Sequence, residues 1–361
     1  MKHVFTKYRG GAIARKIFMF LWPFFLAALV YLSTKFAIRN SGLVEHYFST
    51  GIYPVIAKLF SSFSKLYPIS LWDILWILII WLEVSGLVLV VFRKMKLSRY
   101  LLRTLQLLAL LYSIFYMLWG YNYFRPTIEK RLGWEIPKAD EKLFSSTLDS
   151  IIIEANNSYI SFSSSDYLTI DMLIEESYRK NSRVLGISYP NGTRRPKIML
   201  LSSIYTKLGV SGYFGPFFNE IHLNYYLLPM DYPFVLAHEK GHQFGITSEA
   251  EANLVAYIIC VKSGDQRLVY SGYLSLLLYF LRDATEVREY QEYLNKIDSR
   301  VLLDLRFRQK YYLGLQSKIL SKIQSAANDS YLKANNIEKG VKNYNQVVSL
   351  VINWYYNSNN Y

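Results

Sequence analysis

The sequence is poor in cysteine and in charged residues. Cys260 is the one cysteine among 361 residues, so an internal disulfide framework and a zinc site built from cysteines are both excluded. Charged residues make up only 19% of the chain, below the roughly 25% that is usual in soluble domains. Aromatic residues make up 17%, which argues against an intrinsically disordered chain. The composition indicates a folded protein that is not a simple soluble one.

Acidic residues are scarcest near the N-terminus. Residues 1–124 hold 14 Lys and Arg against three acids, which gives a balance of +11. Residues 125–361 hold 27 Lys and Arg against 24 Asp and Glu, which gives +3. Most of the net charge of +14 therefore lies in the most apolar third of the chain. Basic residues that flank apolar runs are typical of a membrane segment, so this charge does not predict a nucleic-acid partner.

Three apolar runs lie in this third, at about 17–38, 71–92 and 104–124. Each is close to the roughly 20 residues that cross a bilayer as a helix. We therefore expect a membrane anchor with three transmembrane helices over residues 1–124, and a separate domain over 125–361. Three buried helices of a soluble core are the alternative, and the length of the runs disfavours it.

Basic residues predict the orientation of the anchor. The segment before the first run and the loop between the second and third each hold five Lys or Arg and no acid. The loop at 39–70 holds three, together with Glu45. Basic loops stay in the cytoplasm. We therefore expect a multi-pass protein of the cell (inner) membrane, with a cytoplasmic N-terminus and residues 125–361 in the extracytoplasmic or periplasmic space.

Two further expectations concern the membrane region. An aromatic belt on the outer side is expected from Trp72, Trp119, Tyr121, Tyr123 and Phe124. Glu83 falls within the second run. A carboxyl group at that depth is either functional or else neutral or paired with a neighbouring helix, and we favour the second interpretation.

Residues 125–361 predict a mostly helical α+β domain. We expect helices at 144–163 and 166–180, a turn at 189–193 and short strands at 197–201 and 217–225, with an irregular glycine-rich segment at 209–216 between the strands. From residue 250 onwards the pattern is helical, with breaks expected near Gly264, Gly272, Asn328 and Asn336.

The main motif is His238-Glu239-Lys-Gly-His242. On a helix, residues four apart share one face, so both imidazoles can bind the same Zn²⁺ ion. Glu239 is displaced by about 100° around the helix, where it can reach water on the metal. Pro233 near the start and Gly245 after the second histidine are typical of the two ends of such a helix. A pair of histidines on a partly buried helix face is the alternative interpretation.

A catalytic zinc site needs a third protein ligand. Thr247 or Ser248 can cap a new helix after Gly245, and that helix carries Glu249 and Glu251 in its first turn. Glu249 shares a face with Asn253, a candidate partner for a ligating histidine. We favour Glu249 as the ligand over Glu251, although a short loop permits either.

These residues resemble the zincin metallopeptidases, and in particular the gluzincins. His238, Glu239 and His242 match their first motif, and Glu249-x-x-Ala-Asn253 is similar to the motif of their downstream helix. The resemblance implies a zincin-like domain in which Glu249 is the third zinc ligand. The short spacing between His242 and Glu249 is closer to that of metzincins, which have histidine where this chain has Ser248.

The whole layout also resembles an uncharacterised bacterial family of membrane proteins with three N-terminal helices and a zincin-like domain. The segments that resemble it include Gly212–Phe217 before the motif and Tyr270–Tyr273 after it. The resemblance covers most of the chain and implies no particular substrate.

The predicted function is that of a membrane-anchored zinc metallopeptidase that acts on a peptide or protein substrate. Metal-activated water would attack the peptide bond with Glu239 as general base, and residues 217–225 would form an edge strand that binds the substrate. Candidates for stabilising the oxyanion are Tyr270, Tyr273, His222 and Arg308. A catalytically inactive zincin-fold scaffold protein of the cell envelope is the alternative. Intramembrane proteolysis is disfavoured because the segment 233–245 is too short to cross a bilayer.

Overall fold

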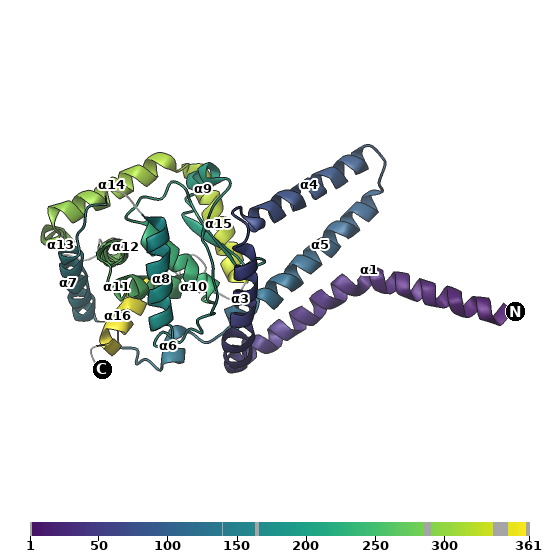
Figure 1. Ribbon diagram of the computed structural model, residues 1–361, viewed down its shortest axis with the longest axis horizontal. Helices are drawn as coiled ribbons and strands as arrows, with labels where there is room; N and C mark the ends of the chain where they lie inside the picture. The colour runs from purple at the N-terminus through teal and green to yellow at the C-terminus, as the bar shows by residue number, and fades with distance from the viewer. Residues whose placement is uncertain (1, 139, 163–165, 285–289, 335–345, 359–361) are drawn as a thin grey trace.

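The computed structural model describes residues 2–138, 140–162, 166–284, 290–334 and 346–358. The chain is mostly helical with a small sheet. Three helices extend from one side of a helical body: α1 (Lys2–Arg39), α4 (Leu71–Val91) and α5 (Leu97–Leu118) (Figure 1). In each of them a segment of 20 to 22 residues is long and apolar enough to cross a membrane, with a mean hydropathy of 1.6 to 2.6.

The third of these helices differs from its expected bounds. It begins at Leu97 instead of residue 104, because Arg99 and Arg103 lie on the helix without interrupting it; long basic side chains are tolerated at a helix end, where their heads reach water. It ends at Leu118, and residues Gly120–Phe124 form the 3₁₀ turn η2. Between two of the apolar helices, Glu83 of α4 accepts a hydrogen bond of 2.7 Å from Thr104 of α5, so it is paired with a neighbouring helix as expected.

The expected aromatic belt stays a prediction for Trp72, Tyr121 and Tyr123, which are half-buried, but its other two members are enclosed by protein. Trp119 and Phe124 are buried, with 5% and 6% of their surface exposed. Tyr121 and Tyr123 pack against them, and Trp72 stacks obliquely on Phe217 with ring centroids 5.2 Å apart. These aromatic rings pack between the apolar helices and the body. Packing against protein removes more of the ring surface from water than a position at a membrane surface would.

The segment between α1 and α4 is folded onto the body. It consists of α2 (Ser41–Leu43), the π-helix η1 (Val44–Ile52) and α3 (Tyr53–Ser64). Tyr53 and Ala57 of α3 are each 1% exposed. The division of the chain at residue 124 stays a prediction, but contacts between the two parts are extensive.

The helices of the body surround the α10–α11 pair (Figure 1). The helix expected at 144–163 is α7 (Glu141–Asn157), which begins earlier, after the capping residue Asp140, and ends earlier, at Asn157. The helix expected at 166–180 is α8 (Tyr167–Asn181), which begins after the capping residue Asp166. The others are α6 (Ile128–Leu132), α9 (Ser202–Leu208), α10 (Tyr232–Gln243), α11 (Glu249–Val261), α12 (Gln266–Ala284), α13 (Tyr290–Lys296), α14 (Ser299–Leu315), α15 (Lys318–Ala334) and α16 (Gln346–Ser358).

Two of the expected helix breaks are wrong. Gly272 lies inside α12 and Asn328 inside α15. A Cβ atom on Gly272 would lie 3.0 Å from Cβ of Cys260, so this glycine allows α11 and α12 to approach closely. Gly264 adopts a left-handed conformation between these helices, with φ of +77°, as a break requires. Asn336 lies outside the described residues.

The sheet has the strand order β1-β3-β2, with β1 (Lys197–Ile198), β2 (Gly212–Gly215) and β3 (Glu220–Leu223). β1 is parallel to β3, and β2 is antiparallel to it with Tyr213 opposite His222. The strand expected within 217–225 is therefore central, and the expectation that it is an edge strand is wrong. The glycine-rich segment expected to be irregular supplies the edge strand β2, because Asn219 with φ of +52° turns the chain back into a hairpin.

Candidate metal centre

The histidine motif lies on α10, in the centre of the body. Pro233 occupies its first turn, where a missing N–H costs no hydrogen bond. His238 and His242 lie on consecutive turns, and their ring centroids are 4.7 Å apart. The helix ends after Gln243, and Gly245 takes a left-handed conformation with φ of +87°. The chain then reverses into α11.

The start of α11 brings a glutamate back to the histidines. Ser248 caps this helix, and its hydroxyl oxygen accepts a hydrogen bond from the backbone N–H of Glu251. α11 packs along α10, and a Cβ atom on Gly241 would lie only 3.8 Å from Cα of Ala252. This close packing places Glu249, the first residue of α11, beside the two imidazoles.

Three side chains converge at this point. Nε2 of His238 and Nε2 of His242 are 3.0 Å apart. Oε2 of Glu249 lies 3.2 Å from Nε2 of His238 and 3.6 Å from Nε2 of His242. One possible ligand atom from each residue lies within 4.8 Å of the others. The spacing suits a single metal ion.

The outer nitrogens of both rings face oxygen atoms. Nδ1 of His238 lies 3.0 Å from Oδ1 of Asn253, and Nδ1 of His242 lies 2.8 Å from the carbonyl oxygen of Ile246. Because a carbonyl oxygen only accepts, each Nδ1 carries the proton and each Nε2 is left with a lone pair. Two lone pairs and a carboxylate directed at one point repel one another unless a proton or a metal ion lies between them. The donor set therefore fits a metal ion, and two histidines with one glutamate fit Zn²⁺.

The carboxylate of Glu249 and the two imidazoles shift one another's pKa values toward the charged forms. Burial by itself lowers the pKa of His242, but the Glu249 carboxylate outweighs it and raises the pKa of His242 to about 9. Burial also works to raise the pKa of Glu249, yet the two imidazoles hold it well below its usual value of 4.5. In both cases the neighbouring group of opposite charge dominates.

Glu251 is directed away from the histidines. One of its oxygens accepts a hydrogen bond of 3.0 Å from the backbone N–H of Ile128, and the other pairs with Arg131 at 2.9 Å. Through these two contacts Glu251 connects α11 to α6. Of the two glutamates that the sequence left open, the structure brings Glu249 to the histidines.

Glu239 lies next to the cluster with its carboxylate buried. Only 5% of its surface is exposed, and Oε2 has no hydrogen-bond partner among the described residues. Burial is the main cause that raises its pKa above 4.5, and the two imidazoles oppose this increase. An unpartnered buried carboxylate is costly, and such a group is typical of a site that acts on a proton.

The edge strand β2 covers this carboxylate. A Cβ atom on Gly212 would lie 2.6 Å from Oε1 of Glu239, so no larger residue fits there without a shift. Side chains of a strand point to the faces of the sheet, and α10 packs on both β2 and β3. Glu239 therefore lies against one face of the sheet, at its edge strand β2.

The four oxyanion candidates have contacts elsewhere. Tyr270 donates to Asp304 at 2.7 Å, and Tyr273 packs on Tyr257. His222 is fully buried beside Ser70, and Arg308 pairs with Asp231 at 2.7 Å. Among the described residues, the hydrogen bonds, ion pairs and ring contacts of these four are made with residues outside the histidine cluster.

Tyr279 is a residue that the sequence did not indicate. It lies on α12. Burial raises the pKa of Tyr279 to about 12, and Glu249 adds to this increase against the opposing effect of Arg308. Tyr279 is therefore within electrostatic reach of the cluster. No local pattern distinguishes it among 32 tyrosines.

Side chains near the apolar helices support the end of α10. Nε1 of Trp119 donates to the carbonyl oxygen of His242 at 3.0 Å, and the hydroxyl of Tyr53 donates to that of Gln243 at 2.6 Å. Nη1 of Arg125 donates to the carbonyl oxygen of Gly245 at 3.0 Å. The last carbonyls of a helix lack partners within it, and here three residues from outside the helix provide them.

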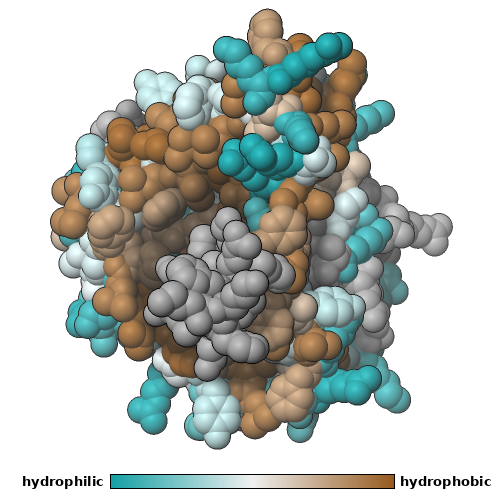
Figure 2. All heavy atoms as spheres, turned by 90° about the vertical axis from the view of Figure 1, so that its right-hand side faces the viewer, coloured by the Kyte–Doolittle hydropathy of each residue, from teal (hydrophilic) through white to brown (hydrophobic). Residues whose placement is uncertain are grey.

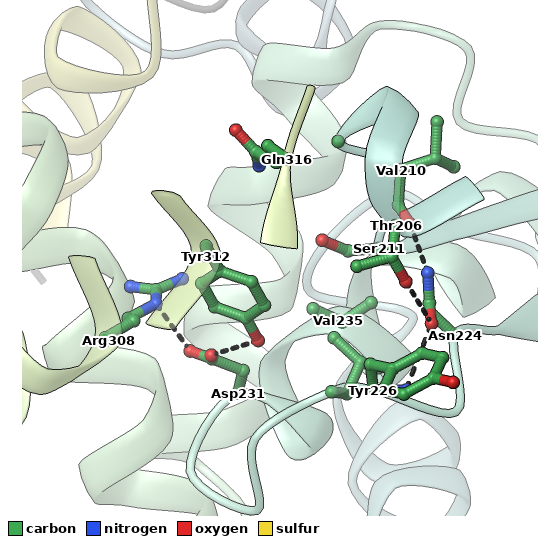
Figure 3. A pocket seen from close by; sticks show the side chains of 12 residues that line it. Thr206, Val210, Ser211, Asn224, Tyr226, Asp231, Val235, Arg308, Tyr312 and Gln316 are labelled. Carbon is green, nitrogen blue, oxygen red and sulfur yellow. Dashed lines mark hydrogen bonds and ion pairs between the residues drawn. The ribbon is translucent and has the colours of Figure 1, made fainter. Parts of the chain in front are cut away.

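A small cavity of about 130 Å³ lies beside the first half of α10 (Figure 3). Val235 of α10 lines it, and this residue lies one helical turn before His238 and Glu239. Ser211, which precedes Gly212, lines another side. Figure 3 shows Asp231 between Arg308 and Tyr312, and Tyr312 donates to its second oxygen at 2.7 Å. The negative charge of Asp231 is thereby neutralised within the wall.

Comparison with known proteins places the chain in a family. The profile of the family described as "Protein of unknown function (DUF3810)" matches residues 48–352. The chain belongs to this DUF3810 family. No curated protein matches the chain, and no solved structure matches it. The DUF3810 match includes α3, the sheet, α10 and α11, so the family profile covers the candidate metal centre and, from residue 48 onwards, the segment between α1 and α4.

Proposed function

We propose that this DUF3810 protein is a membrane-anchored, zinc-dependent metallopeptidase of the zincin type. The observation that carries the proposal is the convergence of His238, His242 and Glu249 beside the buried, unpartnered carboxylate of Glu239. A bound Zn²⁺ ion would supply a Lewis acid that polarises a carbonyl group and lowers the pKa of water.

Glu239 is the general base and acid of this proposal. Its carboxylate is buried beside the proposed ligands, and this burial keeps bulk water from competing for the proton. It accepts a proton from the attacking water and passes it to the amine that leaves. Asn253 and the carbonyl of Ile246 hold the two imidazoles in the tautomer that presents Nε2.

Substrate binding follows from β2 and the cavity. β2 is an edge strand with Gly212 against Glu239, and an extended peptide adds to a sheet edge through main-chain hydrogen bonds. The cavity lined by Val235 then accepts a side chain of that peptide. Because Asp231 and Arg308 neutralise each other, we propose that this side chain is uncharged.

The proposed location is the cell membrane. The three apolar helices are compatible with an anchor, and the basic flanks of 1–16 and 93–103 support a cytoplasmic N-terminus. After three crossings the metal centre lies on the extracytoplasmic side. The substrate is then a polypeptide of the cell envelope or the surrounding space.

The test is made on the full chain in detergent. Metal content is measured by elemental analysis, and cleavage of a mixed peptide library by mass spectrometry, for the wild type, Glu239→Gln and Glu176→Gln. Glu239→Gln should keep its zinc and lose cleavage by about 10²- to 10⁴-fold. Glu176→Gln makes the same chemical change on the exposed surface of α8 and should behave as the wild type.

Three results would contradict the proposal. Absence of bound zinc from the wild-type protein would exclude the zinc site. A zinc-loaded protein that cleaves no peptide would favour an inactive scaffold with a zincin-like site. Equal cleavage by the wild type and by Glu239→Gln would exclude Glu239 as the general base.

A further inference from the structure

Helix α3 turns small residues toward the body and large apolar residues outward, which is the reverse of a helix on the surface of a soluble protein. The face packed on the body carries Tyr53 and three small residues, which are Ala57, Ser61 and Ser64. The opposite face carries large apolar side chains at helical spacing, with exposed fractions of 48–61%: Val55, Leu59 and Phe63. We call these three residues the α3 stripe. A surface helix in water normally turns such a stripe inward.

The stripe continues beyond both ends of the helix. Ile52 precedes it with 55% exposure, and Leu66 follows it with 75%. Positions 52, 55, 59, 63 and 66 recur every three or four residues and so lie along one side. α3 holds one charged residue, Lys58, and Lys65 follows directly. An apolar face with basic neighbours and no acid is typical of a helix that lies on a membrane.

The connections of α3 keep it close to the bilayer. α1 ends at Arg39, and α4 begins at Leu71. The segment 65–70 between α3 and α4 spans at most about 20 Å even when fully extended, at ~3.5 Å per residue. In Figure 1, α3 lies at the side of the body from which α1, α4 and α5 extend, and it runs across them. Figure 2 views this side, and hydrophobic residues cover much of it.

A second apolar patch lies at the start of α4. The backbone N–H of Leu200 donates to Asp73 in the first turn of α4 at 3.0 Å. Leu200, Leu201 and Ile204 are each about half exposed, at 49–50%. Apolar residues therefore lie next to the base of α4 both on α3 and on the segment that leads into α9.

We infer that the α3 stripe lies in the interface of the lipid bilayer, where α3 holds the metal centre close to the membrane surface. The occupant of this face is lipid, because the helix is tied at both ends to the membrane helices and its only charges are basic. The patch at Leu200 and Ile204 lies beside the first turn of α4, to which Leu200 is hydrogen-bonded. This inference depends on the apolar helices crossing a membrane and not on any catalytic activity.

The contact between α3 and the metal centre is direct. Tyr53, on the packed face of α3, donates to the carbonyl oxygen of Gln243 at the end of α10. A Cβ atom on Gly245 would lie 3.1 Å from the ring of Tyr53. The end of α10 is thus about one helix diameter, roughly 10 Å, from the stripe. If the proposed peptidase function holds, its substrates are polypeptide segments that lie beside the membrane.

The single cysteine makes the position of the stripe measurable. Cys260 is fully buried, so a thiol-reactive fluorophore labels an introduced cysteine selectively. Leu59→Cys reports on the stripe. Leu303→Cys on α14 is the matched control, because the two leucines are 61% and 66% exposed. Each labelled full-length protein is placed in vesicles of phosphatidylcholine and phosphatidylglycerol, with and without brominated acyl chains.

The brominated lipids should quench the label at position 59 at least about threefold more strongly than the label at 303, and aqueous iodide should show the reverse order. Equal quenching by bromine at both positions, or strong quenching of position 59 by iodide, overturns the inference. A protein partner as the true occupant would give that second result, since the purified protein would leave the stripe in water.

The substrate class is tested separately with one peptide coupled to a lipid through a short or a long polyethylene glycol linker. Faster cleavage with the short linker supports membrane-proximal substrates, and equal rates contradict them. Absence of cleavage with both linkers contradicts the peptidase function alone, because the quenching result does not depend on it.

Discussion

At the scale of single residues, the position of Glu239 depends on a glycine in another element. Gly212 of β2 leaves the space that the carboxylate fills, and a Cβ atom there would also lie 2.9 Å from Cδ of Glu239. Gly212→Ala should therefore displace the carboxylate and lower kcat/KM by about 10²-fold, while metal content stays unchanged. Gly314→Ala is the control, since a Cβ atom on that glycine meets nothing within 4 Å.

The two glutamates at the start of α11 should behave differently. Glu249→Ala removes a proposed ligand and should weaken zinc binding by more than about 100-fold. Glu251→Ala should keep the zinc but leave the buried Arg131 unpaired, at a cost of about 3 kcal/mol in the free energy of unfolding. Zinc titration and thermal unfolding measure the two effects, and loss of zinc from Glu251→Ala alone would reverse the assignment.

A buried ion cluster behind α10 predicts a dependence of stability on pH. Lys240 is fully buried and pairs with Asp171 at 2.8 Å and with Glu175. Burial works to raise the pKa of Glu175, but Lys240 and Arg194 outweigh it and hold the pKa below 4.5. A depressed pKa stabilises the folded state above the unfolded value of 4.5, and this stabilisation is lost as the pH falls through the folded value.

The matching experiment compares Glu175→Gln with the wild type. At pH 7 the variant should melt several degrees lower, because Lys240 loses a charged partner. The difference in Tm should shrink as the pH falls below about 4.5. A difference in Tm that is constant from pH 7 to pH 3.5 would show that the charge of Glu175 is not the cause.

At the scale of elements, α10 depends on partners outside the helix. Trp119→Phe removes the hydrogen bond to the carbonyl oxygen of His242 and should cost about 1 kcal/mol of stability. The metal dissociation constant should also rise, because His242 is less firmly held. Trp81→Phe is the matched control, since Trp81 is 61% exposed on the apolar helix α4. Equal effects of the two substitutions would contradict this account.

Helices were more predictable than strands, for a physical reason. The starts of α7, α8 and α11 follow from capping residues within a few positions of the helix. The strands have only two to four residues, and their pairing depends on contacts between distant segments. The position of β3 in the centre of the sheet could therefore not be derived from its own residues.

At the scale of the whole molecule, the body and the anchor region stabilise each other. Lys197 of β1 donates to the carbonyl oxygen of Ile69 at 2.8 Å, and Glu220 of β3 accepts from the N–H of Trp72 at 2.9 Å. A fragment of residues 125–361 loses these bonds and those of Tyr53 and Trp119. We expect it to melt at a lower temperature than the full chain, with equal melting temperatures as the contrary result.

The orientation of the chain is a further property of the whole molecule. With three crossings and a cytoplasmic N-terminus, alkaline phosphatase fused after residue 361 should be active, because this enzyme folds only outside the cytoplasm. A green fluorescent protein fused at the same position should be dark, because it does not become fluorescent when the general secretion route exports it unfolded. The opposite pair of results would place the metal centre in the cytoplasm.

The sequence by itself determined those features that depend on neighbours along the chain. The spacing of His238 and His242 places them on one helix face, and the apolar runs specify three long helices, because both follow from helical geometry. The tertiary structure alone decided that Glu249 and not Glu251 reaches the histidines, that Gly212 lies against Glu239, and that the apolar side of α3 faces outward. These features depend on how distant elements pack, and no local pattern encodes that packing.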